Sequence, residues 1–507
     1  MGNATNSKFA IGRTVQSTKD IENVAELVRL PIKYGSTYGI TPSVDAYQDL
    51  VENQMENSRT DVLGAIVNGQ VSGASHPDFL ALMLASILGT VQSASIASGQ
   101  TFTAVAATDV CTAAAHGLTV AQRVKVASST TLPAGLTAGT VYYAGTLTTN
   151  TFKLYPTATD ANNQTNAIDI TDTGTGTHTM TPESYKHTIT PSSSTTPRFH
   201  TILHDDGTTN RKIIGAVPTE MSFAAGFDTK RMDMGVNFTA IRRDYNDDTL
   251  TYTTTVVAAT EVWSATSNLF TTGYPVRLTT TNTLPAGASL ATTYYVGSKI
   301  GDTFKLYTTF EGAASELATD LVSVSDTGTG THTITGYETA YPAQEAINAF
   351  HFTRPGASLK ITIADGAETT YTNNWAGFQY SLKNMIDAEQ RAGSNTFRAI
   401  EISDRGQSLD LTMDYTNQVF ADLIQAYQSE TTPKKIKVEL TLKSRLIGQA
   451  DYFQIRGTFY NCHLADHGYT TDPSLGKQLL RLAVNHDEAA GKSVQWEVWN
   501  DIDSYLT

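Results

Sequence analysis

The sequence is short of cysteine, of charge and of long apolar runs. The two cysteines, Cys111 and Cys462, each stand in an alternating apolar stretch, so a buried free thiol is expected, and a disulfide between them is the open alternative. The longest apolar run, at 79–88, is shorter than the roughly 20 residues that a membrane span needs. These shortages indicate a soluble protein of a reducing compartment, without a membrane partner.

Basic residues are fewer than acidic ones, and the formal net charge is −14. An acidic chain is poorly suited to gripping phosphate backbones, whose affinity comes from Lys and Arg. It remains compatible with a surface past which DNA slides without sticking. The N-terminal segment MGNATNSKFAIGR holds no apolar run and carries Asn6 where myristoylation requires Ser or Thr, so we expect neither a secretory signal nor that modification.

Threonine and tyrosine are abundant, and glycine is scattered throughout the chain. Hydrophobic residues make up 40% of the 507 residues, which is enough for packed cores and suggests roughly three units at about 100–200 residues each. The composition favours β-structure.

An eight-residue stretch, DTGTGTHT, occurs at 172–179 and again at 326–333. Extending the match outward pairs further segments at constant spacing: TLPAG at 131–135 with 283–287, VYYAG at 141–145 with TYYVG at 293–297, and TFKLY at 151–155 with 303–307. A unit of about 80 residues is therefore present twice, over 102–182 and 254–336.

Short β-forming segments separated by turn signals make up this unit. Gly174 and Gly176 suit a tight bend before the last strand. Strands this short at regular spacing predict a small immunoglobulin-like sandwich. His178 and His332 are each alone in their copy, without a second ligand at a fixed offset, so a structural role is favoured over metal binding.

Removing both copies leaves the segments 1–101, 183–253 and 337–507. We interpret them as one host domain, because loop tips tolerate inserted modules. Within 183–253 a strand pair with a DDG turn is expected. Alternating apolar and polar residues predict further half-buried strands throughout 337–507.

Two similar helices are expected in the host domain. In the first, over 77–88, Ser75 is the candidate cap, Pro77 and Asp78 suit the first turn, and Gly89 suits the stop.

The second helix, around 420–426, has Thr416 as its candidate cap. Each helix follows an expected strand pair, DVLGAIVNGQVSG at 61–73 and FRAIEIS with SLDLTMDY at 397–415. The host is thus interpreted as a duplicated strand–strand–helix half, paired into a barrel or sandwich.

No signature of catalysis or cofactor binding is found. The nucleophile elbow, P-loop and Rossmann glycine patterns are all missing. His463 and His467 have the i, i+4 spacing of a helical zinc site, but we place them after a strand and before a turn. DYNDD at 244–248 lacks the ligand pattern of a calcium loop and is interpreted as a solvated acidic turn. We therefore nominate no catalytic, cofactor-binding or metal-binding residues and expect a protein that is not an enzyme.

The host segments, taken in order, resemble the tail tube (major tail) proteins of long-tailed bacteriophages. The resemblance covers most of the host domain, in the segments LPIKYGSTYGITPS, ENSRTDVLGAIVNGQVSGASHPDFLALMLASILG, FTRPGASLKITIADGAETTYTNNWAGFQYSLKNMIDAEQ, SLDLTMDYTNQVFADLIQAY and GYTTDPSLGKQLLRLAVNHDE. The repeated unit, with AHGL, LPAGL, VYY, TFKLY and DTGTGTHT, resembles immunoglobulin-like modules of phage structural proteins. Its second copy departs at 267–270, where SNLF replaces AHGL.

The resemblance implies a mainly β fold: a tail-tube sandwich or barrel with flanking helices, interrupted by two immunoglobulin-like sandwiches. It implies a virion protein that is assembled in the bacterial cytoplasm. In the family, six subunits form a ring, and the rings stack into a tube for genome ejection. Partners would be further copies of itself, the tape measure protein and other tail proteins. Viral DNA would pass without specific binding. An extended arm near 1–50 would reach a neighbouring ring.

The outward-facing modules would be spacers, dispensable decoration or weak binders of host cell-surface glycans. An alternative function is a host-surface adhesin or receptor-binding tail protein, whose modules should stand in tandem at one end. A glycan-degrading tail enzyme would need a carboxylate pair that we cannot nominate. A contractile secretion-system tube shares the host architecture, but the phage-type inserts argue against it.

Overall fold

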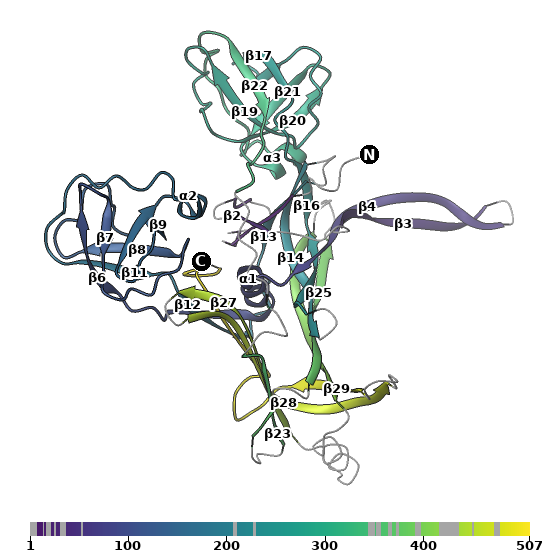
Figure 1. The fold of residues 1–507 in the computed structure, drawn as a ribbon. Helices are drawn as coiled ribbons and strands as arrows, with labels where there is room; N and C mark the ends of the chain where they lie inside the picture. Colours follow the sequence, from purple (N-terminus) through teal and green to yellow (C-terminus); the bar gives the residue numbers. More distant parts are fainter. Residues whose placement is uncertain are drawn as a thin grey trace.

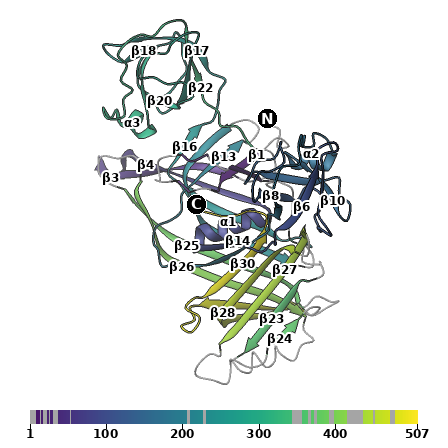
Figure 2. The ribbon, with the colours of Figure 1, turned by 90° about the vertical axis from the view of Figure 1, so that its left-hand side faces the viewer.

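A computed structural model describes residues 8–506 except the following: 14, 17–21, 25–26, 31–36, 52–53, 206–209, 227–229, 343–349, 351–355, 364–367, 372–374, 391–396, 415–434, 449–450 and 471–476. The described part is mainly β, as expected, with large antiparallel sheets and short helices. Figures 1 and 2 show a central body that carries two small barrels.

The central body consists of strands from all three host segments, hydrogen-bonded into one extended sheet system around one helix. From the first segment come β1 (Lys8–Gly12), β2 (Leu27–Leu30), β3 (Thr37–Val51), β4 (Gln54–Ala74), α1 (Pro77–Leu88) and β5 (Gly89–Ser95). From the second come β12 (Tyr185–Pro191), β13 (His200–Asp205), β14 (Asn210–Gly226), β15 (Asp233–Ala240) and β16 (Arg242–Tyr245). From the third come β23 (Ser358–Ile363), β24 (Thr369–Tyr371), β25 (Trp375–Gln390), β26 (Phe397–Asp414), β27 (Ile436–Gly448), β28 (Asp451–Thr470), β29 (Lys477–Asn485) and β30 (Val494–Asn500).

Each copy of the repeated unit forms a closed six-stranded barrel. The first barrel comprises β6 (Gln100–Val105), β7 (Val110–Thr112), β8 (Arg123–Ser128), β9 (Val141–Gly145), β10 (Thr151–Tyr155), α2 (Ala158–Asn163) and β11 (His178–Pro182). The second comprises β17 (Thr251–Val257), β18 (Val262–Ser264), β19 (Pro275–Thr280), β20 (Tyr294–Ile300), β21 (Thr303–Tyr307), α3 (Phe310–Ser315) and β22 (His332–Gly336). Each barrel has a hydrophobic core of its own.

The closed barrels differ from the immunoglobulin-like sandwiches that we expected. The reason lies in the first strand of each barrel, which changes partner midway. In β6, residues 100–102 pair with β11 and residues 103–105 pair with β7. In β17, residues 251–254 pair with β22 and residues 255–257 pair with β18. A strand shared in this way joins two sheet halves that would otherwise face each other as a sandwich.

The core of the central body forms around α1, all twelve residues of which are buried. The helix packs against β14 and β25 in one part of the sheet and against β12, β30 and β5 in another. One continuous hydrophobic cluster includes Leu84 from the first host segment, Phe223 from the second and Trp496 from the third. A helix that is apolar all round is stable only when surrounded in this way.

The ends of α1 follow the sequence signals in part. Pro77 occupies the first turn, and Gly89 ends the helix in the left-handed conformation, with φ of 93°. The prediction that Ser75 caps the helix is wrong. The N-cap residue is His76, whose side chain makes no capping hydrogen bond. The reason is tertiary, because the backbone N–H of Ser75 donates to the carbonyl of Met232 at 2.9 Å. The second expected helix, with Thr416, lies outside the described residues.

We expected a pair of strands before each of the two helices, but each of these segments belongs to a single long strand. The segment 61–73 lies wholly within β4, and 397–414 forms β26. The Asn-Gly dipeptide at 68–69 does not turn, because Asn68 is paired with Gly39 of β3 on one side and with Thr239 of β15 on the other. A strand with ladders on both sides is held extended against its local turn preference.

Both cysteines are free and buried. The expectation of buried free thiols is confirmed, and the alternative of a disulfide between them is wrong. Burial raises the pKa of the Cys111 and Cys462 thiols to about 12. Neither thiol therefore reacts readily in the folded protein, because the thiolate is the nucleophile.

A buried histidine, His200, joins three elements of the central body. Its Nδ1 donates to the carbonyl of Gly12 at the end of β1 over 3.0 Å, and its Nε2 lies 2.8 Å from Oγ of Ser86 in α1. Complete burial disfavours the charged ring and lowers the pKa of His200 from 6.5 to about 4.

This shift predicts acid destabilisation. Because the pKa of His200 is lower in the folded state, the unfolded chain takes up the proton first. The stability is present above about pH 6.5 and is lost as the pH falls toward 4, by roughly 3 kcal/mol at most. Urea unfolding at pH 7 and pH 4.5 should therefore show a smaller pH effect in His200→Gln, whose amide cannot become charged. Equal pH effects in the two proteins would contradict the assignment.

Candidate assembly surfaces

The first candidate surface is the projecting hairpin of β3 and β4. The two strands pair from Thr37 with Gln70 to Val51 with Gln54. The other side of β4 pairs with β15 only over Val67–Ala74. The stretch beyond this ladder therefore projects from the body, as Figure 1 shows, by about 40 Å at a rise of about 3.3 Å per residue.

The hairpin presents open backbone edges. Among the described strands, β3 has β4 as its single partner. An open edge offers unpaired N–H and C=O groups to another chain, and a lone two-stranded hairpin is at best marginally stable in water. Such an element is well suited to strand addition against a second protein.

The free arm expected near 1–50 is only partly present. Residues 8–12 form β1, which pairs with β13 and β2 inside the same body. The part of β3 that projects is 41–51, beyond the anchored ladder, and it projects as one strand of a hairpin. The strand β1 stays within the body because it pairs with β13, and its side chains Phe9 and Ile11 are fully buried there.

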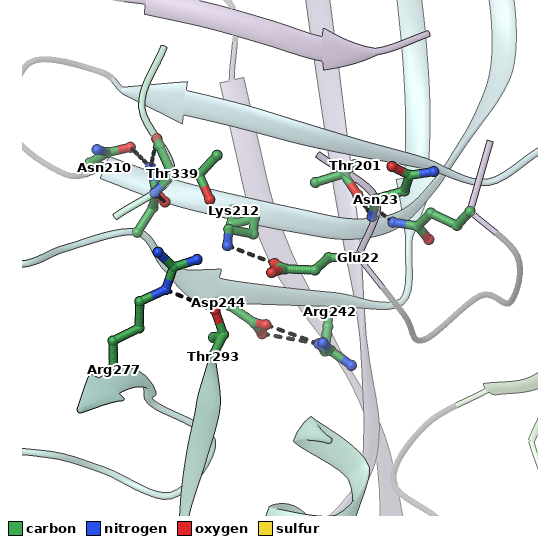
Figure 3. Close-up of polar contacts among 12 residues, drawn as sticks. Glu22, Asn23, Thr201, Asn210, Lys212, Arg242, Asp244, Arg277, Thr293 and Thr339 are labelled. Atoms are coloured by element: carbon green, nitrogen blue, oxygen red, sulfur yellow. Dashed lines mark hydrogen bonds and ion pairs between the residues drawn. The ribbon is translucent and has the colours of Figure 1, made fainter. Parts of the chain in front are cut away.

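Buried charged side chains of the body lie beneath the second barrel, as Figure 3 shows. On β16 the Nε of Arg242 lies 3.1 Å from a carboxylate oxygen of Asp244, and both side chains are buried. Nearby, Lys212 Nζ lies 2.6 Å from Glu22, and only 1% of the lysine side chain is exposed. Burial raises the pKa of Asp244, while Arg242 and Lys212 oppose that rise. The solvated acidic turn expected at 244–248 is thus wrong for Asp244.

Aromatic rings of the barrel and its connection cover these charges. The guanidinium of Arg242 lies 4.1 Å from the ring centre of Phe310 in α3, and Nζ of Lys212 lies 5.1 Å from the ring centre of Tyr337, just after β22. Tyr245 of the body stacks on Tyr274 of the barrel, with ring centres 4.8 Å apart. Cation–π contacts strengthen when desolvated, so the barrel is held in one orientation.

The two chain connections to the second barrel are also clasped together. Asn246, fully buried before β17, accepts from the N–H of Thr339 at 2.7 Å and donates to the carbonyl of Thr339 at 3.2 Å. Its amide also donates to Asn210 at 3.1 Å. Because Thr339 follows β22, the entering and leaving chains are joined where they meet the body.

The first barrel is attached by a smaller set of contacts. Lys125 of β8 lies 3.1 Å from the buried Glu183 and 3.6 Å from Asp503. The hydroxyl of Thr119 donates to the carbonyl of Ile447 in β27 at 3.1 Å. Both barrels are therefore docked on the body rather than suspended from linkers.

The repeated octapeptide forms the same staple in each barrel. In the first, His178 contacts Ser128 Oγ at 3.0 Å through Nδ1 and the carbonyl of Thr173 at 2.9 Å through Nε2. In the second, His332 makes the matching contacts with Thr280 and Thr327, each at 2.9 Å. This is the structural role expected for the two histidines.

The aspartate that opens the octapeptide fixes the adjoining turn. Asp172 Oδ1 accepts from the N–H groups of Ala134 and Gly174, both at 2.8 Å, and Asp326 does the same with Ala286 and Gly328. These bonds lower the pKa of both carboxyl groups. The aspartate and the histidine of the octapeptide thus hold the same turn in each barrel.

The two histidines with zinc-site spacing lie elsewhere than expected. His463 and His467 both belong to β28, which continues to Thr470, so the turn placed after them was wrong. A strand does not bring residues i and i+4 to the neighbouring positions that they take on a helix. Across the described residues, His, Cys, Asp and Glu side chains form no group of three able to hold a metal.

Comparisons with known proteins return little. No family model matches the sequence, and no curated protein matches it. Among solved structures, one chain from the cryo-EM structure of the anti-feeding prophage (AFP) baseplate, 6-fold symmetrised, matches at 11% identity and a TM-score of 0.22. The match covers 29% of this chain and 95% of that chain. A score this low establishes neither a shared fold nor a shared function. In the part of the chain that the structure describes, no helix has the length and apolarity to span a bilayer.

The buried pair under the second barrel generates a prediction. Arg242→Met leaves Asp244 buried without its cation and should lower the free energy of unfolding by about 3–5 kcal/mol. Adding Asp244→Leu removes the unpaired charge and should restore most of the loss. Chemical denaturation of the single and double variants measures both. A double variant no more stable than Arg242→Met would show that the pair does not act as described.

Proposed function

We propose that this chain is a tail tube subunit of a long-tailed bacteriophage, a virion protein that self-assembles into stacked rings. The observation that carries the proposal is the projecting β3–β4 hairpin, whose outer strand has no second partner among the described strands. A long open edge of this kind is an aggregation hazard in a monomer and is removed when subunits close a sheet between them.

The docked barrels support the same function. Three host segments, 1–101, 183–253 and 337–507, form the tube domain in this proposal, and 102–182 and 254–336 are insertions of immunoglobulin-like ancestry. A single hydrophobic cluster drawn from the three host segments supports this division. An adhesin would hold its modules in tandem at one end, whereas here the barrels leave the body at two separate places, as Figure 2 shows.

The remaining parts of the proposal concern partners. The rings are hexameric and contact the tape measure protein and other tail proteins, and viral DNA passes through them during ejection into the host. The barrels face outward and contact host-surface glycans weakly or act as spacers. The charge distribution is consistent with this: segment 102–182 contains four acidic and three basic residues, and segment 254–336 contains six acidic and three basic residues, so −10 of the net charge of −14 belongs to the tube domain.

Electron microscopy of the purified protein tests the assembly. We expect rings or stacked tubes that form with increasing protein concentration. Monomers at every concentration, together with adsorption to bacterial cells, would instead favour the adhesin.

Shortening the hairpin gives a sharper test. Deleting residues 46–60 and joining the strands with an Asn-Gly turn removes the outer part of the projecting hairpin but keeps the ladder between β4 and β15. We expect a folded protein, with an unchanged far-ultraviolet circular dichroism minimum, that forms no tubes. Deleting the β17–β22 barrel between Asn246 and Thr339 provides the control, which should still assemble. Tubes from the shortened hairpin would contradict the assembly role.

A further inference from the structure

The first barrel has a groove at the point where β6 leaves β11 and pairs with β7 instead. The groove has a volume of about 670 Å³ and is lined by residues 101–104, 112–114 and 173–178. Three segments therefore form it: β6, the end of β7 with the residues after it, and the loop of the octapeptide. In Figure 1, β6 and β7 lie on the side of this barrel farthest from the central body. Docking of the barrel thus leaves the groove open.

Threonine is the commonest residue in this lining. All the lining threonines are exposed, and among the described residues their hydroxyl groups have no hydrogen-bond partner. They are Thr101, Thr103, Thr112, Thr173, Thr175 and Thr177. A hydroxyl group both donates and accepts hydrogen bonds. The groove therefore offers a ligand several free donors and acceptors, with a methyl group beside each of them.

Two buried rings hold the groove in shape. Phe102 and His178 are part of the lining but are only 3% and 5% exposed, and their ring centres lie 5.6 Å apart. His178 is itself fixed by its contacts with Ser128 and with the carbonyl of Thr173. A site that is already ordered loses little conformational freedom on binding, so a few hydrogen bonds suffice for a weak ligand.

The side chains of the groove indicate which ligands fit it. The lining contains no Asp, Glu, Lys or Arg, whereas nucleic acids and other polyanions are bound through Lys and Arg. Its large apolar ring, Phe102, is buried, so an apolar helix would find no large apolar side chain to pack against. The ligand that matches this lining is uncharged and rich in hydroxyl groups, with C–H surfaces between them. These are the properties of a neutral sugar.

The second barrel has hydroxyl groups at the corresponding positions. The ladders align β17 with β6 and β18 with β7. The corresponding residues are Thr253, Thr255, Ser264, Thr327, Thr329 and Thr331. Elsewhere the two surfaces differ, because Leu269 and Ile300, 70% and 77% exposed, stand where the first barrel has Gly117 and Thr148. Each chain therefore carries the hydroxyl pattern twice, on surfaces that are otherwise dissimilar.

We propose that the groove of the first barrel binds a neutral glycan chain, and that the matching hydroxyl groups of the second barrel do the same. The inference rests on the part of the proposed function in which the barrels face outward, and it adds the binding site and the uncharged nature of the glycan. Because the groove is open to solvent, one site holds one sugar weakly. Many copies in a tube that contact the same glycan strengthen the attachment without any new contact.

Saturation-transfer difference NMR tests the site, because it detects weak ligands and does not depend on assembly. The probes are three neutral trisaccharides, maltotriose, chitotriose and mannotriose, together with tetra-alanine as an uncharged extended peptide. Thr101→Val combined with Thr103→Val removes two hydroxyl groups of the groove at almost unchanged shape and β-propensity. Thr140→Val removes an exposed hydroxyl group outside the groove and is the matched control.

We expect at least one trisaccharide to receive saturation from the unmodified protein. The Thr101→Val, Thr103→Val variant should lower this signal about twofold, since the second barrel still binds. Adding Thr253→Val and Thr255→Val should remove the signal, because both sites have then lost hydrogen-bond partners. The control variant Thr140→Val should give the signal of the unmodified protein.

Saturation of none of the trisaccharides would overturn the inference, as would an unchanged signal from the Thr101→Val, Thr103→Val variant. Saturation of tetra-alanine that the trisaccharides do not displace would show that the groove takes an extended peptide instead. Electron micrographs of the same preparations separate this result from the proposed function. Tubes without sugar binding overturn the groove alone, whereas sugar binding without tubes supports the groove and favours the adhesin.

Discussion

The antiparallel ladder between β3 and β4 is the constraint on which the architecture depends. Its inner part is anchored, because β4 also pairs with β15. Its outer part extends from the body with an open edge. Backbone donors and acceptors arranged in this way are satisfied by water in the monomer, or by a second chain. From this ladder the sheet continues through β15, β14, β25, β26 and β29, one face of which carries the host core around α1.

The barrels depend on this body in a different manner. Each folds around its own core, and each also contacts the body: Lys125 of the first barrel lies 3.1 Å from Glu183, and Phe310 of the second barrel covers the guanidinium of Arg242. Beneath the second barrel the ion pair of Arg242 and Asp244 is buried within the body, where desolvation offsets much of its net contribution to stability. A fixed orientation is needed if decorations are to stand clear of neighbouring subunits in a closed ring. Flexible linkers would have left that position to chance.

Local signals predicted some elements well. Pro77, the apolar run at 79–88 and Gly89 mark α1 without reference to the rest of the chain. The apolar surroundings of the two cysteines predicted free thiols. Among the candidate assembly surfaces, the sequence did not reveal the ion pairs beneath the second barrel. Lys212, within the apolar strand sequence RKIIGAV, is the signal that would have indicated one of them, because a lysine there has to find a buried partner.

The sequence by itself determined the two copied units, their strands, the staple formed by the repeated octapeptide and the buried helix. The strands and the buried helix depend on apolar periodicity, and the copied units are evident from the repetition itself, whereas the partners of the octapeptide, such as Ser128 for His178, lie about 50 residues away in the chain. Tertiary structure alone decided that Asn68 and Gly69 continue a strand, that the copied units close into barrels, and that Asp244 is buried. Each of those outcomes follows from partners far away in the sequence. Long-range backbone pairing and desolvation outweigh the local turn and charge preferences on which such predictions are based.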